Sequence, residues 1–136
     1  MTPENQRENI REELDRASES LEAANLLAGG KYYKDAISRL YYSLFHTTKA
    51  LLLSIGLEAR NHEGVLRLLG MHFVKTGILT SSDSHILSRL MKYREEADYN
   101  PSYVFNEQDF KELLSESQSL DKKIRQYLKD KGYIKA

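Results

Sequence analysis

The sequence predicts an all-α protein, a single domain (residues 1–136) built as a five-helix up-and-down antiparallel bundle. Apolar residues recur at three- and four-residue steps in five segments, and the alternating pattern of strands is missing. Only two prolines and seven glycines interrupt the 136 residues. The segments are long and their connections short, which is typical of antiparallel helical neighbours.

The first two predicted helices differ in how many sides are apolar. The first has one apolar stripe and stops at Gly29-Gly30; its members are Ile10, Leu14, Ala17, Leu21, Ala24 and Ala28. The second covers about residues 32–55, ends at Gly56 and has two stripes; they consist of Tyr33, Ile37, Leu40, Leu44, Thr48, Leu51 and Ile55, and of Tyr42, Phe45 and Leu52. A helix that is apolar on two sides is packed on two sides. We therefore expect the second helix to be central.

Start and stop signals delimit the other three helices. The third follows Asn61, a suitable N-cap residue, and ends near Gly77. The fourth begins at the polar residues 81–83 and ends before Pro101, because the residue before a proline disfavours the helical conformation. The fifth opens at Asn106, with Asp109 three residues on in a capping-box-like pair, and runs to about Gly132.

Composition narrows the class of protein. Cysteine is absent, which excludes disulfides and thiolate metal sites, and the four histidines show no metal-binding spacing. We therefore predict no metal and no cofactor. The first residues are polar and no apolar run approaches the roughly 20 residues that span a bilayer, so a cytoplasmic protein with no membrane contact is expected. Charge sums to zero, with an acidic start and a mildly basic middle that could attract phosphate.

Two polar residues stand out in the second helix. Arg39 and His46 are seven residues apart, so they share a face about two turns apart. A buried helix carries such groups only with partners, because an unpaired buried charge is costly. Either they line a site, or a carboxylate pairs with Arg39 and a backbone carbonyl with His46. Lys49 follows three residues later and either extends a basic patch or reaches water.

A second cluster lies at the end of the fourth helix. Arg94 falls on the apolar stripe, so it faces the bundle or a partner. Asp98, four residues on, either pairs with it or joins Tyr99 at a ligand site. His62 lies at a helix start, where free backbone amides can bind an anion; capping or plain exposure is the alternative. The nine tyrosines suit a homodimer interface or base stacking.

These residues carry a family resemblance. Ser38-Arg39-Leu-Tyr-Tyr-Ser-Leu-Phe-His46, His62-Glu-Gly-Val65, Phe73-Val-Lys-Thr-Gly77 and Tyr93-Arg94-Glu-Glu-Ala-Asp98-Tyr99 resemble the small stand-alone HEPN-domain proteins of bacteria and archaea, a UPF0332-like group. The resemblance extends from about residue 10 to residue 128. It implies a helical bundle that dimerises face to face, often encoded beside a minimal nucleotidyltransferase in toxin–antitoxin pairs. It also implies that a tyrosine near this motif, here Tyr99, can be a target of nucleotidyl transfer.

Many members of that family are metal-independent ribonucleases that use an arginine and a following histidine at the dimer cleft. The arginine corresponds to Arg94, but Tyr99 stands where the histidine is expected. A tyrosine, with a pKa of about 10, suits proton transfer at neutral pH less well than histidine. The question of an enzyme therefore stays open, and the sequence favours binding over catalysis.

Three hypotheses follow from the sequence. The first is a homodimer that binds nucleotide or RNA phosphate at a dimer cleft and acts with a minimal nucleotidyltransferase; its binding residues are Arg39, His46, Lys49, His62, Arg94, Asp98 and Tyr99. The second is a metal-independent ribonuclease toxin in which Arg94 binds the scissile phosphate and Tyr99 or His46 assists. The third is a purely structural dimer in which both arginines are ion-paired.

Overall fold

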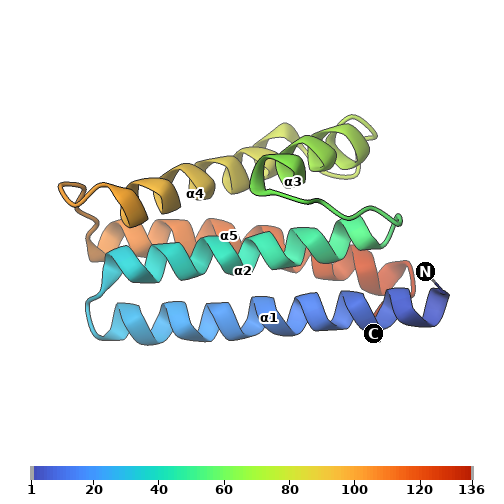
Figure 1. Cartoon of the computed structure of the whole chain (residues 1–136), viewed down its shortest axis with the longest axis horizontal. Helices are drawn as coiled ribbons and strands as arrows, with labels where there is room; N and C mark the ends of the chain where they lie inside the picture. Colours follow the sequence, from blue (N-terminus) through green and yellow to red (C-terminus); the bar gives the residue numbers. More distant parts are fainter. Residues whose placement is uncertain (1, 136) are drawn as a thin grey trace.

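The computed structural model describes residues 2–135, which form five α-helices, one short π-helical segment and no strand. The elements are α1 (Pro3–Gly29), α2 (Tyr33–Leu53), α3 (His62–Leu69), the π-helical segment η1 (Gly70–Val74), α4 (Ser81–Tyr99) and α5 (Glu107–Asp130). Figure 1 shows α1, α2, α4 and α5 running alongside one another, with the shorter α3 beside α4. The predicted all-α bundle is confirmed.

Helix α2 is the centre of the bundle, as its two apolar stripes predict. It packs most extensively on α1 and also contacts α3, α4 and α5. Its side chains Ile37, Leu40 and Leu44 are almost entirely removed from solvent. Each such side chain contributes about 1.5–3 kcal/mol relative to an exposed one, so this helix anchors the fold.

Side-chain caps fix where the helices begin. Asn61 Oδ1 accepts a hydrogen bond from the Gly64 amide at 2.7 Å, and Asn106 forms a complete capping box with Asp109, so both predicted starts are confirmed. The cap of α4 is Thr80. Helix α1 begins earlier than its first apolar residue, because Thr2 caps a polar first turn that no apolar stripe reveals.

The connection between α1 and α2 is tight. Helix α1 ends at Gly29, as expected, but the residue with left-handed backbone is Lys31 (φ 68°), and Gly30 keeps a negative φ. Lys34 Nζ then donates to the Asn100 carbonyl at 3.0 Å. This bond joins the start of α2 to the end of α4.

Helix α3 continues without a break into η1. The Lys75 amide donates to the Gly70 carbonyl at 3.0 Å, five residues back, which is the bond of a π-helical turn. Val65, Leu69 and Phe73 are all fully buried along this stretch. The wider turn therefore keeps one continuous face in the core.

The path of the chain between α2 and α3 positions the candidate site. Figure 1 shows this connection running back along α2, so that α3 begins beside the middle of α2 and below α4. None of the helices in residues 2–135 combines the length and the apolar character needed to cross a membrane.

Candidate functional site

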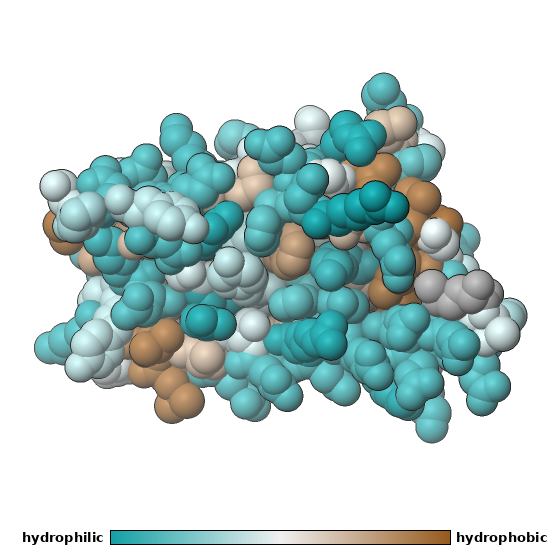
Figure 2. Space-filling view, in the orientation of Figure 1, coloured by the Kyte–Doolittle hydropathy of each residue, from teal (hydrophilic) through white to brown (hydrophobic). Residues whose placement is uncertain are grey.

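An open groove lies where α2, the start of α3 and the end of α4 meet. Its lining consists of Tyr42, His62, Arg94, Glu95, Glu96, Tyr99 and Asn100. Figure 2 shows that the face between the two ends of the molecule is largely hydrophilic, with hydrophobic areas toward those ends. The groove brings together three residues singled out in the sequence, namely His62, Arg94 and Tyr99.

Arg94 is buried but incompletely paired. It is 8% exposed, and its guanidinium carbon lies 5.3 Å from the ring centre of Tyr41 and 5.9 Å from that of Tyr42. Its Nη1 is 3.6 Å from Asp98 Oδ2, so the predicted pair exists but is longer than a hydrogen bond. Its Nε is buried and has no hydrogen-bond partner among residues 2–135. A buried guanidinium with unused donors is suited to binding an anion.

His62 is held over the groove by aromatic side chains. Its Nδ1 lies 2.6 Å from the Tyr41 hydroxyl, and its ring centre is 4.6 Å from that of Phe45. The helix cap is Asn61 and His62 is half-buried, so capping and plain exposure are both wrong for His62. Burial lowers the pKa of His62 below its ordinary value, and the positive charge of Arg94 lowers it further. The imidazole is therefore mostly neutral near pH 7.

Tyr41 supports this arrangement from inside the bundle. Burial raises its pKa well above the ordinary value for tyrosine, and the nearby charge of Arg94 offsets only part of that rise. The phenol therefore stays protonated and can donate its hydrogen to Nδ1 of His62. In that tautomer the other ring nitrogen, Nε2, carries the proton.

Arg39 is exposed, contrary to the burial expected of it. It lies on the stripe of α2 that faces away from the bundle, which the high apolar content of the helix concealed. Its guanidinium carbon is 5.8 Å from the ring centre of Tyr42. No carboxylate pairs with it within the described part of the chain. The ring of Tyr42 thus contacts Arg39 and Arg94.

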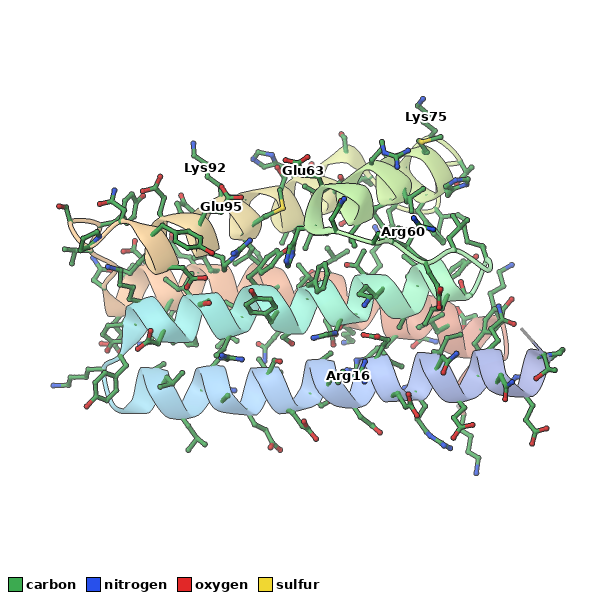
Figure 3. The ribbon with its side chains drawn as sticks, viewed as in Figure 1. Arg16, Arg60, Glu63, Lys75, Lys92 and Glu95 are labelled. Atoms are coloured by element: carbon green, nitrogen blue, oxygen red, sulfur yellow. The ribbon has the colours of Figure 1, made fainter. Side chains whose placement is uncertain are left out.

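His46 and Lys49 belong to a different contact. His46 Nδ1 is 2.7 Å from Glu13 Oε2, and Lys49 Nζ and Arg16 Nη1 are 3.6 Å and 3.0 Å from Glu13 Oε1. Figure 3 shows Arg16 on the side of α1 that faces α2. The partner of His46 is therefore a carboxylate and not a backbone carbonyl, which was one of the two alternatives for this residue.

The buried carboxylate of Glu13 is held ionised by these neighbours. Burial alone would raise its pKa, but the hydrogen bond with His46 and the charges of Lys49, His46 and Arg16 bring the pKa below its ordinary value. His46 and Lys49 are thereby engaged on the α1 side of α2. The structure shows no contact of either residue with Arg94.

Several residues of these two clusters are not among the predicted site residues, and four of them make the contacts described above: Glu13, Tyr41, Tyr42 and Phe45. A signal existed for Glu13, which lies three residues after Ile10 and four before Ala17, on the apolar stripe of α1. The tyrosines were recognised only as packing or stacking residues. Their contacts with Arg94 join α2 to α4, and no local spacing predicts such a pairing.

The groups in the groove can bind a ligand in a few specific ways. One buried cation, a neutral imidazole and several aromatic faces can hold a phosphate and a stacked base. Glu95 and Glu96 lie at the rim and oppose an anion there, although Glu96 also accepts a hydrogen bond from Asn100. Among the described residues, no three His, Asp or Glu side chains come together as metal ligands would.

Comparison with known proteins shows which proteins this chain is similar to. The model of the HEPN domain matches residues 10–127. A Methanocaldococcus jannaschii protein named "Putative toxin MJ0605" is 33% identical over 124 residues, covering 91% of this chain and 92% of that protein. A second protein of the same organism, named "Putative toxin MJ0142", is 32% identical over 122 residues, covering 90% of this chain and 83% of that protein. A "UPF0332 protein" of Thermotoga maritima is 32% identical over 115 residues, covering 85% of this chain and 87% of that protein.

Proposed function

Because this chain belongs to the HEPN domain family, we propose that it is a cytoplasmic homodimer that binds the phosphate of a nucleotide or of RNA in the groove between α2, α3 and α4. Its role is toxin-like, in a toxin–antitoxin-type pair with a minimal nucleotidyltransferase. The names of the Methanocaldococcus relatives support the toxin-like role. The nucleotidyltransferase partner and the dimer rest on the family resemblance.

The observation that carries the proposal is the state of Arg94. A guanidinium that is 8% exposed, lies 3.6 Å from its nearest carboxylate oxygen and has an unused Nε lacks the partners that normally accompany a buried charge. A phosphate would supply short, charge-assisted hydrogen bonds to it. Asp98 would keep its ion pair with the guanidinium and help to orient it.

Aromatic side chains beside Arg94 favour a nucleotide over a simple anion. Tyr42 and His62 line the groove, and Tyr99 is 76% exposed at its rim. Such faces stack on bases without strong sequence preference. Arg39, whose guanidinium carbon lies 5.8 Å from the ring centre of Tyr42, would add a second phosphate contact. The exposed Tyr99 is also the residue available to a second copy of the chain, or to a nucleotidyltransferase that modifies it.

Titration tests the proposal directly. A fluorescently labelled single-stranded RNA and a labelled adenine nucleotide would be titrated with wild type, Arg94→Ala and Lys92→Ala at several salt concentrations. Lys92 lies on the same helix and extends away from the bundle in Figure 3, so its variant removes one charge without touching the groove. We expect Arg94→Ala to weaken binding at least tenfold and to flatten the salt slope by about 0.7, while Lys92→Ala changes neither.

The alternative outcomes of that titration are equally clear. Equal losses of affinity in the two variants would mean that binding depends only on the overall charge of the protein, and would reject the groove as the binding site. Titrations without any binding, made on protein shown by sedimentation to be dimeric, would favour the purely structural dimer. A monomer at micromolar concentration would reject the homodimer.

A second candidate function, metal-independent ribonuclease, is favoured by His62. The imidazole shares the groove with Arg94, in a chain whose motif has Tyr99 in place of histidine. In such a reaction the RNA 2′-hydroxyl loses its proton to a base and its oxygen bonds to phosphorus. The bond from phosphorus to the 5′-oxygen breaks, and that oxygen takes a proton from an acid. Arg94 would balance the charge on phosphorus.

Incubation with total RNA in the presence of EDTA tests this candidate. Cleavage by wild type that is lost in both Arg94→Ala and His62→Gln, but kept in His46→Gln, would support it. Cleavage that is unchanged in His62→Gln would reject the role of His62, and binding without any cleavage would leave the first proposal standing alone.

A further inference from the structure

A second hollow lies on another side of α4 and shares no lining residue with the groove. It has a volume of about 350 Å³ and lies between α4, the connection to α5 and the first turns of α5. Figure 1 shows this connection at the same end of the bundle as the turn between α1 and α2. A hollow of this size can hold a small molecule.

Three aromatic rings form one wall of the hollow. The ring centres of Tyr103 and Phe105 are 4.8 Å apart, and Tyr93 lies 5.7 Å from Phe105 and 6.4 Å from Tyr103. Phe105 is buried, whereas Tyr103 is 36% exposed at the opening. The faces of such rings carry partial negative charge and attract cations.

Three carboxylates of α5 also line the hollow. Asp109, Glu112 and Glu116 follow one another at three and four residues, so they share the face of the helix that lines the hollow. The one cationic side chain in the lining is Arg89, which forms an ion pair with Glu116. His85 and Lys92 line a neighbouring hollow and not this one. Acidic groups therefore outnumber basic ones three to one in the lining.

The internal contacts of these acids leave capacity for a ligand. Asp109 accepts a hydrogen bond from the Asn106 amide as part of the helix cap. Glu112 is exposed and accepts from the neutral side chain of Gln108 at 3.1 Å. Glu112 thus has no cationic partner among residues 2–135, and it lines the same hollow as the three aromatic rings. An anion would be repelled by this arrangement, and a neutral molecule would lack the charge attraction that a cation has to the carboxylates.

From this combination we propose that the hollow is a binding site for a small organic cation, with its ammonium group between the rings of Tyr103 and Phe105 and the carboxylate of Glu112. The site differs in charge from the Arg94 groove and does not depend on the function proposed for that groove. The ligand class is a quaternary or substituted ammonium compound. Aromatic rings combined with carboxylates recognise such ions through cation–π attraction and charge.

A pair of probes that differ only in charge tests the proposal. Choline and its neutral isostere 3,3-dimethylbutan-1-ol have nearly the same shape, and their binding to the full chain can be compared by ligand-observed NMR. We expect choline to bind at least tenfold more tightly than the alcohol. Tyr103→Leu should weaken choline binding roughly two- to fivefold, which corresponds to one ring in a cation–π contact. Glu112→Gln should weaken it by at least as much.

Glu107→Gln serves as the matched control. Glu107 is on the first turn of α5, pairs with the exposed Lys111 and does not line the hollow. Its variant should bind choline as wild type does. Equal binding of choline and the alcohol would overturn the proposal, as would a loss in Glu107→Gln equal to that in Glu112→Gln. Absence of choline binding by wild type, with helical content intact, would overturn it as well.

Discussion

The hydroxyl of Tyr41 lies 2.6 Å from Nδ1 of His62, and this contact joins the buried middle of α2 to the first residue of α3. It places an imidazole over a groove that also contains the under-paired guanidinium of Arg94. The position of α3, the orientation of His62 and the setting of Arg94 therefore depend on the same tyrosine.

Replacing Tyr41 with phenylalanine should separate the hydrogen bond from the packing of the ring. We expect Tyr41→Phe to lower the free energy of unfolding by about 0.5–1.5 kcal/mol, because the ring stays and one buried hydrogen bond is lost. Urea unfolding measures this loss. Tyr127→Phe is the control, since the Tyr127 ring also packs edge-on, against Phe73, and no hydrogen bond of its hydroxyl is seen in the described chain. Equal losses in the two variants would contradict the role given to the Tyr41–His62 bond.

The pKa of His62 should depend on the positive charge of Arg94. NMR titration of the His62 ring should give a midpoint below the ordinary 6.5, because burial and the charge of Arg94 disfavour the imidazolium. In Arg94→Gln the midpoint should rise but stay below 6.5, since burial and the weaker effect of Lys49 remain, and Glu95 acts in the opposite direction. Lys92→Gln should leave it unchanged. A midpoint that does not move in Arg94→Gln would place the guanidinium farther from His62 than the structure does.

Stability at low pH should depend on Glu13. Its pKa is lower in the folded protein than the ordinary 4.5, so its ionised form favours the folded state. Near pH 7, the free energy of unfolding of wild type should exceed that of Glu13→Gln by about 1.5–3 kcal/mol, because a hydrogen bond to a charged group contributes that much. That advantage should be complete above pH 4.5 and should disappear as the pH falls through the lower pKa of the folded state.

Chemical denaturation of both proteins at several pH values checks the Glu13 prediction. Glu12→Gln, at the exposed neighbouring position, is the control and should show little difference from wild type at any pH. A Glu13→Gln difference that persists unchanged at pH 3 would show that the effect is one of packing and not of charge.

Tyr42 should distinguish ligands with a base from ligands without one. If a base stacks on its ring, Tyr42→Leu should weaken binding of nucleotide or RNA by about 1–3 kcal/mol and leave the affinity for inorganic phosphate nearly unchanged. Calorimetry with the two ligands makes the comparison. Tyr32→Leu, at a 63% exposed tyrosine outside the groove, should behave like wild type. Parallel losses for phosphate and nucleotide would assign to Tyr42 only a role in holding Arg94.

The fold could be predicted from the sequence because its determinants are local. Asn61 and Asn106 cap the helices that follow them, and the two apolar stripes of α2 correctly indicate its central place. Arg39 shows the limit of that reasoning. The two apolar stripes of α2 predict a helix packed on two sides, and Arg39 is expected to be buried with it, yet an outward stripe remains and Arg39 is on it.

The candidate site was less accessible to sequence reasoning because its contacts are long-range. The sequence identified Arg94 as facing the bundle, but the rings that receive its guanidinium come from α2. His62 depends on a hydroxyl 21 residues away, and His46 on a carboxylate 33 residues away. Spacing along one helix reveals a shared face and does not reveal which helix lies opposite.

The π-helical turn between Gly70 and Val74 holds one residue more than an α-helical turn would. In a regular α-helix, adding one residue rotates everything before it by about 100° relative to everything after it. The wider turn takes up the extra residue, so Phe73 stays in the core while His62 faces Tyr41. A second residue inserted here would turn either Phe73 out of the core or His62 away from Tyr41.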